Sequence, residues 1–320
     1  MNTRPLLKLL SDGAVHSGES LAEILGVSRT AIWKQVRKLI DKGIPVETIR
    51  GRGYQLAAPM DLVTREGIEQ GLNESARRQM ALRVHDQIDS TNSDITRRWQ
   101  EGERGLLVSV ADSQQQGRGR RGRVWQSPAG QNLYMSVGIS MNRGFTELDG
   151  LSLVAGLALL EALADKGLAN PALKWPNDLL VDGKKLAGIL IELQGELEGA
   201  VRVIVGIGVN VHMLEAESVD QPWTSLDLSA PEADWRRDDL AASVLNRLLG
   251  HLSVFEASGF GPFAEPWNRY DAFRGRKLVA TSGNLSGVGE GVDESGNYMI
   301  STDSSVERIY AGEISLRVAE

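Results

Sequence analysis

A pair of short amphipathic helices joined by a glycine turn, close to the amino terminus, most constrains what this chain can fold into. Ser17 and Ser28 each stand shortly before apolar residues at helical spacing, where a helix N-cap is expected. Gly26 lies between the two predicted helices, in a tight turn that needs a permissive residue. Residues 17–40 therefore predict a helix-turn-helix, preceded by a leucine-rich helix over residues 6–10.

The segment that follows predicts a wing. Residues 46–49 and 54–56 have the composition of short strands, and Arg50-Gly51-Arg52-Gly53 forms a basic turn between them. A helix-turn-helix followed by a basic hairpin is typical of a winged helix, whose wing rests on the DNA backbone. The side chains expected to face DNA are Ser28, Arg29, Thr30, Trp33, Lys34, Arg37, Arg50 and Arg52.

The distribution of charge supports a separate amino-terminal module. The first sixty residues carry nine Lys and Arg against five Asp and Glu, whereas the whole chain has a formal net charge of −7. A basic end on an acidic chain favours contact with nucleic acid. The alternative is a three-helix adaptor that binds no DNA. Trp33 fits DNA less well, because an indole offers one donor and no acceptor, so it would pack on a thymine methyl or sugar or contact another protein.

Composition excludes several classes of site. The chain has no cysteine, so disulfides, thiolate metal sites and thiol nucleophiles are excluded. Its four histidines, at positions 16, 85, 212 and 251, lack ligand spacing, so we predict no protein metal site. No apolar run reaches the roughly 18 residues of a membrane span, and no signal-peptide pattern precedes Ser11. We therefore expect a cytoplasmic protein without a membrane partner.

Strand-like and helix-like segments alternate after a shift in composition at Ala57-Ala58-Pro59, which predicts a central α+β domain. Helices are expected over 61–72, 91–100, 151–166 and 236–250, and strands over 82–87, 106–111, 133–139, 186–193 and 201–209. Five further strands, over 277–281, 285–292, 298–301, 306–310 and 313–316, are separated by turns at 282–284 and 295–297. They predict a small barrel or sandwich at the carboxy terminus.

A basic, glycine-rich loop at residues 117–123 has the sequence Gly-Arg-Gly-Arg-Arg-Gly-Arg. Glycines let the backbone approach a ligand closely, and arginines supply fixed cationic forks that suit phosphate and carboxylate. The loop therefore predicts an anion clamp, with a nucleotide phosphate as its ligand. A nucleic-acid patch and a solvated charged loop are the alternatives.

Three more motifs lie at the edges of the predicted elements: Ser90-Thr91-Asn92, Lys174-Trp175-Pro176-Asn177-Asp178-Leu179 followed by Lys185, and Gly206-Ile207-Gly208-Val209-Asn210. The hydroxyls of the first motif could cap the helix after it. The last motif lacks the third glycine and the helix of a dinucleotide fingerprint. Taken singly, each motif is weak.

In this order and spacing the four motifs resemble those of the biotin–protein ligase family. With the winged helix in front, the resemblance is to its bacterial bifunctional members, biotin ligases that also repress the biotin operon. It covers nearly the whole chain, including residues 312–317. The resemblance implies an α+β fold with a winged helix-turn-helix at 1–60, a catalytic α/β domain with a mixed sheet at 61–271 and a small β-barrel at 272–320.

The resemblance also implies a reaction. Biotin and ATP form biotinyl-5′-adenylate and pyrophosphate, with Mg²⁺ screening the phosphates, and biotin then passes to one lysine of the biotin carboxyl carrier protein. The residues it implies for biotin are Ser90, Thr91, Asn92, Gln114, Arg118, Gly119, Arg120 and Lys185. Those for the nucleotide are Asn177, Asn210, Trp223 and Arg317, and those for catalysis are Lys185, Arg118, Arg120 and Asp178.

Alternatives stay open at three of these sites. Asp178 either steers the carrier lysine or is a buried structural carboxylate paired with Lys174 or Lys185. Arg317 either reaches the ATP phosphates or forms a surface salt bridge. Trp125 and Trp175 wall the biotin pocket or pack in the core.

The expected partners are the carrier protein, operator DNA and a second copy of the chain in a ligand-induced homodimer. The candidate surfaces for forming this homodimer are the arginine loop, the turn at 142–144 and an edge strand near 189–194. The alternatives are a ligase whose winged helix does not regulate biotin genes, and a transcription factor with an inactive ligand-binding domain.

Overall fold

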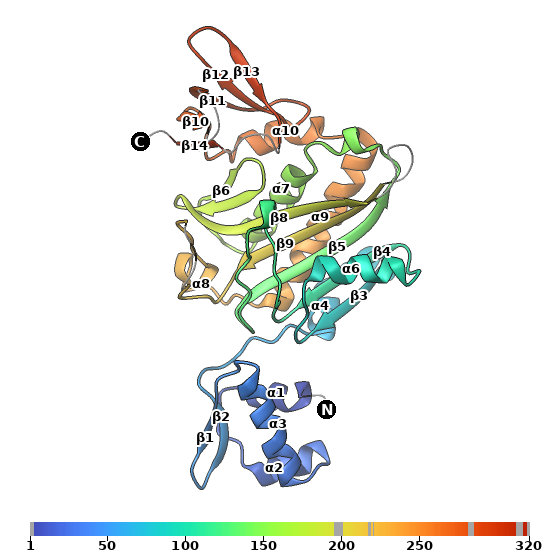
Figure 1. The fold of residues 1–320 in the computed structure, drawn as a ribbon, viewed down its shortest axis with the longest axis vertical. Helices are drawn as coiled ribbons and strands as arrows, with labels where there is room; N and C mark the ends of the chain where they lie inside the picture. The colour runs from blue at the N-terminus through green and yellow to red at the C-terminus, as the bar shows by residue number, and fades with distance from the viewer. Residues whose placement is uncertain are drawn as a thin grey trace.

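The computed structural model describes residues 3–194, 201–216, 219, 221–280, 285–311 and 316–318. The chain forms an α+β molecule of three parts, with the amino-terminal part at one end and the carboxy-terminal sheet at the other (Figure 1). The four sequence motifs predicted to bind ligands fall in the central part.

The amino-terminal part is the predicted winged helix-turn-helix. It consists of α1 (Arg4–Leu10), α2 (Gly18–Leu25), α3 (Arg29–Asp41) and the antiparallel hairpin of β1 (Val46–Ile49) and β2 (Gly53–Leu56). The side chains of Ser17 and Ser28 accept hydrogen bonds from the backbone N–H three residues on, as N-caps do. Gly26 has a φ of 63°, which explains the glycine in the turn. Leu6, Ile32 and their neighbours form a core of their own.

The central sheet has seven strands in the order β3-β4-β5-β9-β8-β7-β6. Only β3 and β4 run parallel, so the sheet is mixed. The strands are β3 (Met80–His85), β4 (Leu106–Ala111), β5 (Asn132–Met141), β6 (Pro171–Lys174), β7 (Asp178–Val181), β8 (Lys184–Gln194) and β9 (Val201–Asn210). Sequence reasoning missed β6 and β7, because they flank a functional motif and are stabilised by neighbouring strands rather than by local composition.

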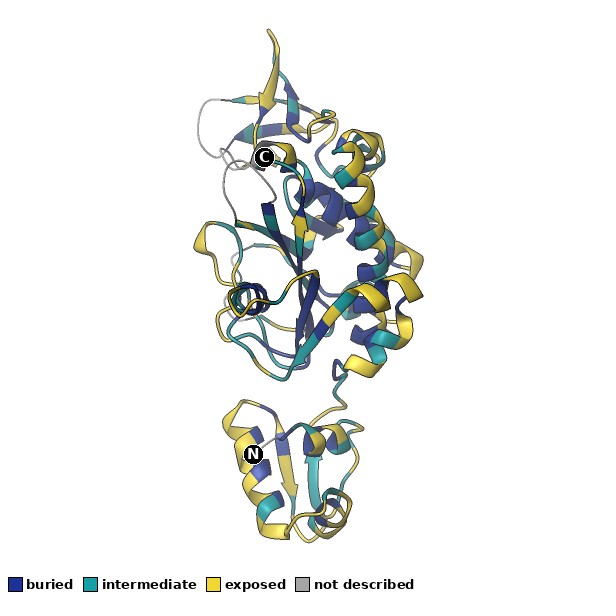
Figure 2. Cartoon of the chain, turned by 90° about the vertical axis from the view of Figure 1, so that its right-hand side faces the viewer, coloured by how far each residue is buried: buried dark blue, intermediate teal, exposed yellow. Residues whose placement is uncertain are grey.

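Helices cover both faces of this sheet (Figures 1 and 2). The long helices α7 (Leu151–Asp165) and α9 (Arg237–Ser258) pack together on one face, where α7 is buried along most of its length. Helix α6 (Thr91–Gln100) lies on the other face, against β4, β5 and β9. The apolar core therefore lies between the sheet and the α7–α9 layer, which leaves the α6 face available for a site.

Several helix boundaries differ from the prediction. The Thr64 side chain accepts a hydrogen bond from the N–H of Gly67 as the N-cap, so α4 spans Arg65–Gly71 and begins later than the expected residue 61. Helix α9 continues beyond residue 250, because Leu252 and Phe255 extend its buried side. The short helices α5 (Glu74–Gln79), α8 (Leu226–Ser229) and α10 (Gly261–Asn268) were not predicted.

The predicted five-stranded carboxy-terminal domain is confirmed. Its antiparallel strands are β10 (Lys277–Ala280), β11 (Ser286–Val292), β12 (Tyr298–Ser301), β13 (Val306–Ile309) and β14 (Leu316–Val318). Their order is β13-β12-β11-β10-β14, and β13 does not pair with β14 among the described residues. The predicted turn at 282–284, and the strand start at 313, lie outside those residues.

Candidate active site

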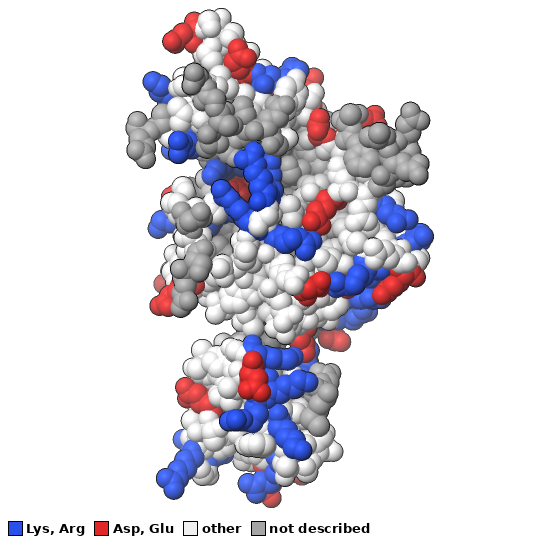
Figure 3. Space-filling view, viewed as in Figure 1, with Lys and Arg blue, Asp and Glu red and all other residues white. Residues whose placement is uncertain are grey.

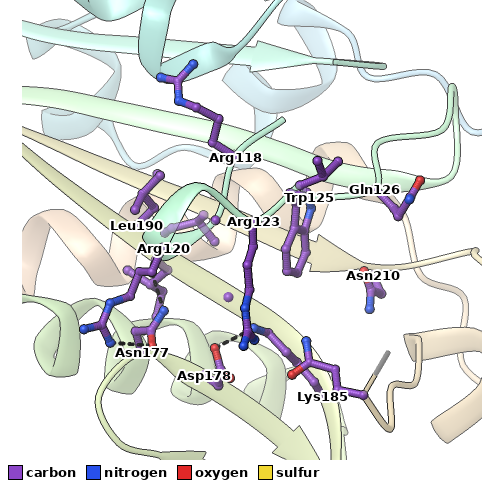
Figure 4. Close-up of a pocket in the computed structure, with 18 of the residues that line it drawn as sticks. Arg118, Arg120, Arg123, Trp125, Gln126, Asn177, Asp178, Lys185, Leu190 and Asn210 are labelled. Atoms are coloured by element: carbon purple, nitrogen blue, oxygen red, sulfur yellow. Dashed lines mark hydrogen bonds and ion pairs between the residues drawn. The ribbon is translucent and has the colours of Figure 1, made fainter. Parts of the chain in front are cut away.

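A cavity of about 590 Å³ opens beside the central sheet (Figure 4). Its walls come from the arginine loop, the turn between β6 and β7, strands β8 and β9, and the segment after β9. Every residue predicted to serve biotin, the nucleotide or catalysis lines it: Ser90, Thr91, Asn92, Gln114, Arg118, Gly119, Arg120, Asn177, Asp178, Lys185, Asn210, Trp223 and Arg317. The fold thus brings motifs that are distant in the sequence to one place.

The lining of the cavity is strongly cationic. Among the described residues, its charged side chains are seven cations and one carboxylate: Arg118, Arg120, Arg121, Arg123, Lys174, Lys185, Arg317 and Asp178. Figure 3 shows Lys and Arg gathered around a hollow in this part of the surface. Burial and the charge of Arg121 lower the pKa of Arg120, although Asp178 opposes that change. Such a surplus of positive charge attracts an anionic ligand.

A polar cluster forms one end of the cavity. Gln114 accepts a hydrogen bond from the N–H of Thr91 at 2.9 Å and donates to Ser127 at 3.2 Å. The Ser136 hydroxyl lies 2.6 Å from Thr91 Oγ1 and 2.6 Å from Asn92 Oδ1. Ser90 is the N-cap of α6, but its side chain makes no capping bond. The cluster therefore presents fixed donors and acceptors, as a neutral polar group requires.

Two positions of the arginine loop require glycine, each for a different structural reason. At Gly117 a Cβ would lie 2.5 Å from the Ser127 hydroxyl oxygen, so the close approach excludes a side chain. Gly122 has a φ of 73°. Arg121 also has a positive φ, of 56°, a sparsely populated conformation for a residue with a side chain. The loop is thus held in a specific turn over the cavity.

The first two arginines of the loop point in different directions (Figure 4). Arg120 donates to Asn177 Oδ1 at 3.1 Å, which joins the loop to the turn between β6 and β7. Arg118 points away from Lys185 and Asp178, and its guanidinium lies against Ser93 and Glu192. Of the two arginines predicted to close over the reacting groups, this structure brings Arg120 near them and directs the Arg118 side chain elsewhere.

Lys185 and Asp178 form an ion pair at 2.7 Å, and both side chains are largely buried. Lys185 Nζ also lies 5.5 Å from the centre of the Trp125 ring. This pairing agrees with the alternative interpretation of Asp178 as a buried carboxylate bound to Lys185. Lys174, the other suggested partner, lies over the Phe273 ring instead. A lysine and a carboxylate in contact can also exchange a proton with a substrate.

The motif Lys174–Asp178 is the hairpin turn between β6 and β7 and contains a cis peptide bond before Pro176. Trp175 is buried and donates its indole N–H to Gly296 O, in the carboxy-terminal domain. Asn177 donates to Ile189 O at 2.8 Å, which ties the turn to β8. The Trp175 contacts support its packing role, and the carboxy-terminal domain therefore supports one wall of the cavity.

The Gly-x-Gly motif of β9 forms the floor of the cavity. A Cβ at Gly206 would lie 2.4 Å from Asn92 Oδ1, and one at Gly208 would lie 2.6 Å from the Trp125 ring. These glycines therefore make room for two side chains against the sheet rather than for a phosphate. Trp125 lies flat against the strand and walls the pocket, as one of its two interpretations predicted.

Three of the residues predicted for the nucleotide, Asn210, Trp223 and Arg317, also line the cavity, whereas the fourth, Asn177, lies beside Arg120. Asn210 donates to Thr224 O at 2.9 Å, and its Oδ1 has no protein partner among the described residues. The backbone on either side of Trp223 hydrogen-bonds with the backbone of Lys185. Arg317, in β14, reaches the rim from the carboxy-terminal domain.

Some lining residues were not assigned a role from the sequence. They include Arg121, Arg123, Gln126, Met213 and Gln221. Arg121 and Arg123 belong to the arginine loop, so the charge of that motif was the signal that could have found them. Gln126, Met213 and Gln221 belong to no motif, and their position depends on how the chain returns to the sheet.

Comparison with known proteins decides the family. Residues 84–210 match the model of the biotin/lipoate A/B protein ligase family, and residues 3–55 match that of an HTH domain. The bifunctional ligase/repressor BirA of Escherichia coli (strain K12) is 38% identical over 325 residues, which cover 100% of this chain and 99% of that protein. The chain belongs to the biotin–protein ligase family.

Two more relatives extend this biotin–protein ligase assignment. The bifunctional ligase/repressor BirA of Bacillus subtilis (strain 168) is 30% identical, with 98% of each chain covered. The structure of a biotin protein ligase from Aquifex aeolicus in complex with biotin and ATP aligns with a TM-score of 0.64 and 32% identity. That alignment covers 74% of this chain and 99% of the other.

The residues predicted to contact DNA in this biotin–protein ligase occupy two exposed surfaces. Arg29, Thr30, Trp33, Lys34 and Arg37 lie on the exposed side of α3, and Arg50 and Arg52 lie at the tip of the β1–β2 hairpin. Trp33 is 51% exposed, and the Arg37 guanidinium lies over its ring. Ser28 uses its hydroxyl as the N-cap of α3.

Neither a metal cluster nor a membrane-spanning helix is found in the described part of this biotin–protein ligase. No group of three or more metal-ligating side chains occurs there. Its four histidines each contact a carboxylate, and they do not gather. Within the same residues, no helix is both long enough and apolar enough to cross a membrane.

Proposed function

We propose that this protein joins biotin to ATP and transfers biotin to a lysine of the biotin carboxyl carrier protein, and that its adenylate-bound dimer represses the biotin operon. One observation carries the proposal. A single cavity holds a neutral polar cluster, the Lys185–Asp178 pair and the arginine loop, in a chain that begins with a helix-turn-helix.

The polar cluster suits the ureido ring of biotin. That ring has two N–H donors and one carbonyl acceptor, and Thr91, Asn92 and Gln114 carry both kinds of group. Trp125, Met135 and Ile207 supply apolar surface for the thiophane and the valeryl chain. The carboxylate of biotin then extends toward Lys185.

In the first half-reaction a carboxylate oxygen of biotin attacks the α-phosphorus of ATP. The new oxygen–phosphorus bond forms as the bond to the β-phosphate oxygen breaks, and pyrophosphate leaves. Two anions must approach each other, so Lys185 between them lowers the barrier. Arg120 and Arg123 balance charge on the phosphates, and Asn210 offers its free Oδ1 to the adenine amino group.

In the second half-reaction the amine of the carrier lysine attacks the acyl carbon, and AMP leaves. The amine must lose a proton, and Asp178 is the carboxylate among the described residues that line the cavity. Release of Lys185 from its ion pair, once Lys185 binds phosphate, frees Asp178 to accept that proton. The structural pairing of Asp178 is thus compatible with a catalytic role.

We infer that Mg²⁺ enters with ATP as part of the substrate. Magnesium in nucleotide sites is held by one or two carboxylates together with substrate phosphates. Asp178 is the carboxylate among the described lining residues, and it is bound to Lys185. The phosphates of ATP would therefore carry the ion.

Biotin-dependent exchange of pyrophosphate into ATP tests the enzyme activity. Lys185→Gln is expected to lower the exchange rate by about 100-fold or more, because it removes one electrostatic contact in the transition state. Its matched control is Lys184→Gln, an exposed neighbour outside the cavity, which should retain the wild-type rate. Wild-type protein without biotin-dependent exchange would contradict the proposal.

The dimer has a candidate surface in β8. Strand β9 pairs with β8 as far as Gln194, but β7 pairs with it only as far as Gly188. Residues 190–194 thus lack a strand partner on one side among the described residues, as edge-to-edge pairing with a second copy requires. Sedimentation with biotin and ATP should show a shift from monomer toward dimer. A protein that stays monomeric would contradict the proposed homodimer.

Operator binding is tested by a gel shift with DNA from upstream of biotin-synthesis genes. Trp33→Ala should change the preference among base sequences, because the exposed ring lies on the face of α3 that would enter the major groove. Lys34→Ala should weaken binding to all DNA sequences alike and reduce the salt dependence of that binding. If biotin and ATP produce no gel shift, the proposed repressor function is contradicted. The proposed ligase activity is not affected by that result.

A further inference from the structure

Glu192 joins the ligand cavity to the open edge of the central sheet. It lies in β8, within the stretch that β7 does not cover. One carboxylate oxygen accepts a hydrogen bond from Asn92 Nδ2 at 3.0 Å. The other lies 3.4 Å from the Arg118 guanidinium. A single carboxylate therefore contacts two residues predicted to bind biotin.

The contact with Asn92 continues into the polar cluster. Asn92 Oδ1 lies 2.6 Å from the Ser136 hydroxyl, which lies 2.6 Å from Thr91 Oγ1. Thr91 donates in turn to Gln114. A continuous chain of side chains thus leads from Glu192 through the whole group proposed to hold the ureido ring. Linked polar groups of this kind orient one another.

The contact with Arg118 ties the arginine loop to the same carboxylate. Arg118 also donates to Ser93 Oγ at 3.1 Å, in α6, so its guanidinium lies between α6 and β8. The loop is therefore attached to the sheet at the point where β8 lies open. Ordering of the loop by a ligand restricts Arg118, and through it Glu192.

We propose that Glu192 is a positioning residue that orients Asn92 and Arg118 for biotin and transmits occupancy of the biotin site to the open edge of β8. The proposal rests on the proposed function, because it takes biotin as the ligand. Glu192 touches neither reacting group; it acts through its two partners. Fixing the Glu192 side chain also restricts the backbone of residues 190–194, the stretch offered to a second copy.

Two variants separate the contacts of Glu192. Glu192→Gln keeps an oxygen that can accept from Asn92 but removes the charge facing Arg118. Glu192→Ala removes both contacts. We expect biotin affinity to fall about two- to fivefold for the first, the range for one partly exposed ion pair, and further for the second. The matched control is Glu74→Gln in α5, which breaks an exposed Arg78–Glu74 pair outside the cavity and should leave affinity unchanged.

A double-mutant cycle tests whether the charge acts through Arg118. Glu192→Gln, Arg118→Gln and the double variant are compared by calorimetric titration with biotin. The losses should be non-additive, with the double variant little worse than Arg118→Gln alone. Additive losses overturn the assignment. The assignment is also overturned if the wild type binds biotin and both Glu192 variants bind it with the same affinity. A wild type that binds no biotin contradicts the proposed function instead.

Hydrogen exchange tests the transmission to the edge. It is measured with biotin alone, at a protein concentration where sedimentation shows monomer. Biotin should slow exchange in a peptide covering residues 189–194 of the wild type and of Glu74→Gln, and slow it less in Glu192→Ala. If Glu192 had a purely structural role, Glu192→Ala would change hydrogen exchange in this peptide equally with and without biotin. Exchange at 189–194 that does not respond to bound biotin in the wild type overturns the coupling.

Discussion

Arg4, in the first helix of the amino-terminal domain, lies 2.5 Å from the carboxylate of Asp112, directly after β4. The same carboxylate accepts from the Arg237 guanidinium at 2.7 Å and from the N–H of Val63 at 3.1 Å. Asp112 and Arg237 are almost fully buried. One buried carboxylate therefore links the helix-turn-helix domain, the linker and helix α9, two residues before the ligand-site residue Gln114.

Arg4→Gln is expected to loosen the attachment of the amino-terminal domain. The change leaves part of the Asp112 charge without its partner, at a cost of about 1–3 kcal/mol in the free energy of unfolding. Urea unfolding measures this cost, and hydrogen exchange in α1 should become faster. Lys8→Gln, on an exposed position of the same helix, is the control and should unfold like the wild type. Identical unfolding curves for Arg4→Gln and Lys8→Gln would contradict the prediction.

Gly206→Ala should destabilise the protein and weaken biotin binding together. The added Cβ would lie 2.4 Å from Asn92 Oδ1, which must move and break its contact with Ser136. Overpacking of this kind costs about 1–3 kcal/mol in the free energy of unfolding. Gly250→Ala, in helix α9, meets no atom within 4 Å and should stabilise the helix by about 0.5–1 kcal/mol. Thermal unfolding compares the two, and equal midpoints would refute the steric explanation.

His212 gives the stability of the protein a pH dependence. Burial opposes its charge, but hydrogen bonds with Asp61 and Asp227 outweigh burial and raise its pKa above 6.5. The folded state then binds the proton more tightly than the unfolded state, so the stabilisation is complete below about pH 6.5 and is lost as pH rises through the folded pKa. His212→Gln should therefore be destabilised relative to the wild type at about pH 6, on the order of 1 kcal/mol, and less so at about pH 9. Urea unfolding of both proteins at the two pH values measures this difference in the free energy of unfolding. A difference that does not change with pH would contradict the prediction.

Arg120→Gly should release the reactive intermediate. Arg120 lines the cavity and joins its loop to Asn177, so its loss is expected to open a path for biotinyl-5′-adenylate to diffuse out. The escaped anhydride would then acylate exposed lysines of any protein nearby. Mass spectrometry of biotin on serum albumin, added beside the carrier protein, detects this. Arg120→Lys keeps a positive charge and should label albumin less; labelling confined to the carrier in Arg120→Gly would contradict the assignment.

The sequence was sufficient for features that depend on near neighbours. The caps Ser17 and Ser28, the turn at Gly26 and the strand periods of β4 and β12 each involve residues within a few positions, so their signals survive without tertiary context. The four motifs also supplied most of the residues expected at the site, all of which line the cavity. The short strands β6 and β7 were missed because neighbouring strands, not local composition, stabilise them.

By itself, then, the sequence determined the winged helix-turn-helix, five of the seven strands of the mixed sheet, the family and the motifs that line the cavity. Only the tertiary structure decided what those residues contact. It paired Asp178 with Lys185, turned Arg118 toward Glu192 and attached Arg4 to Asp112. The physical reason is distance along the chain: Asn92 and Glu192 are 100 positions apart, and only the register of β5, β9 and β8 brings them to 3.0 Å.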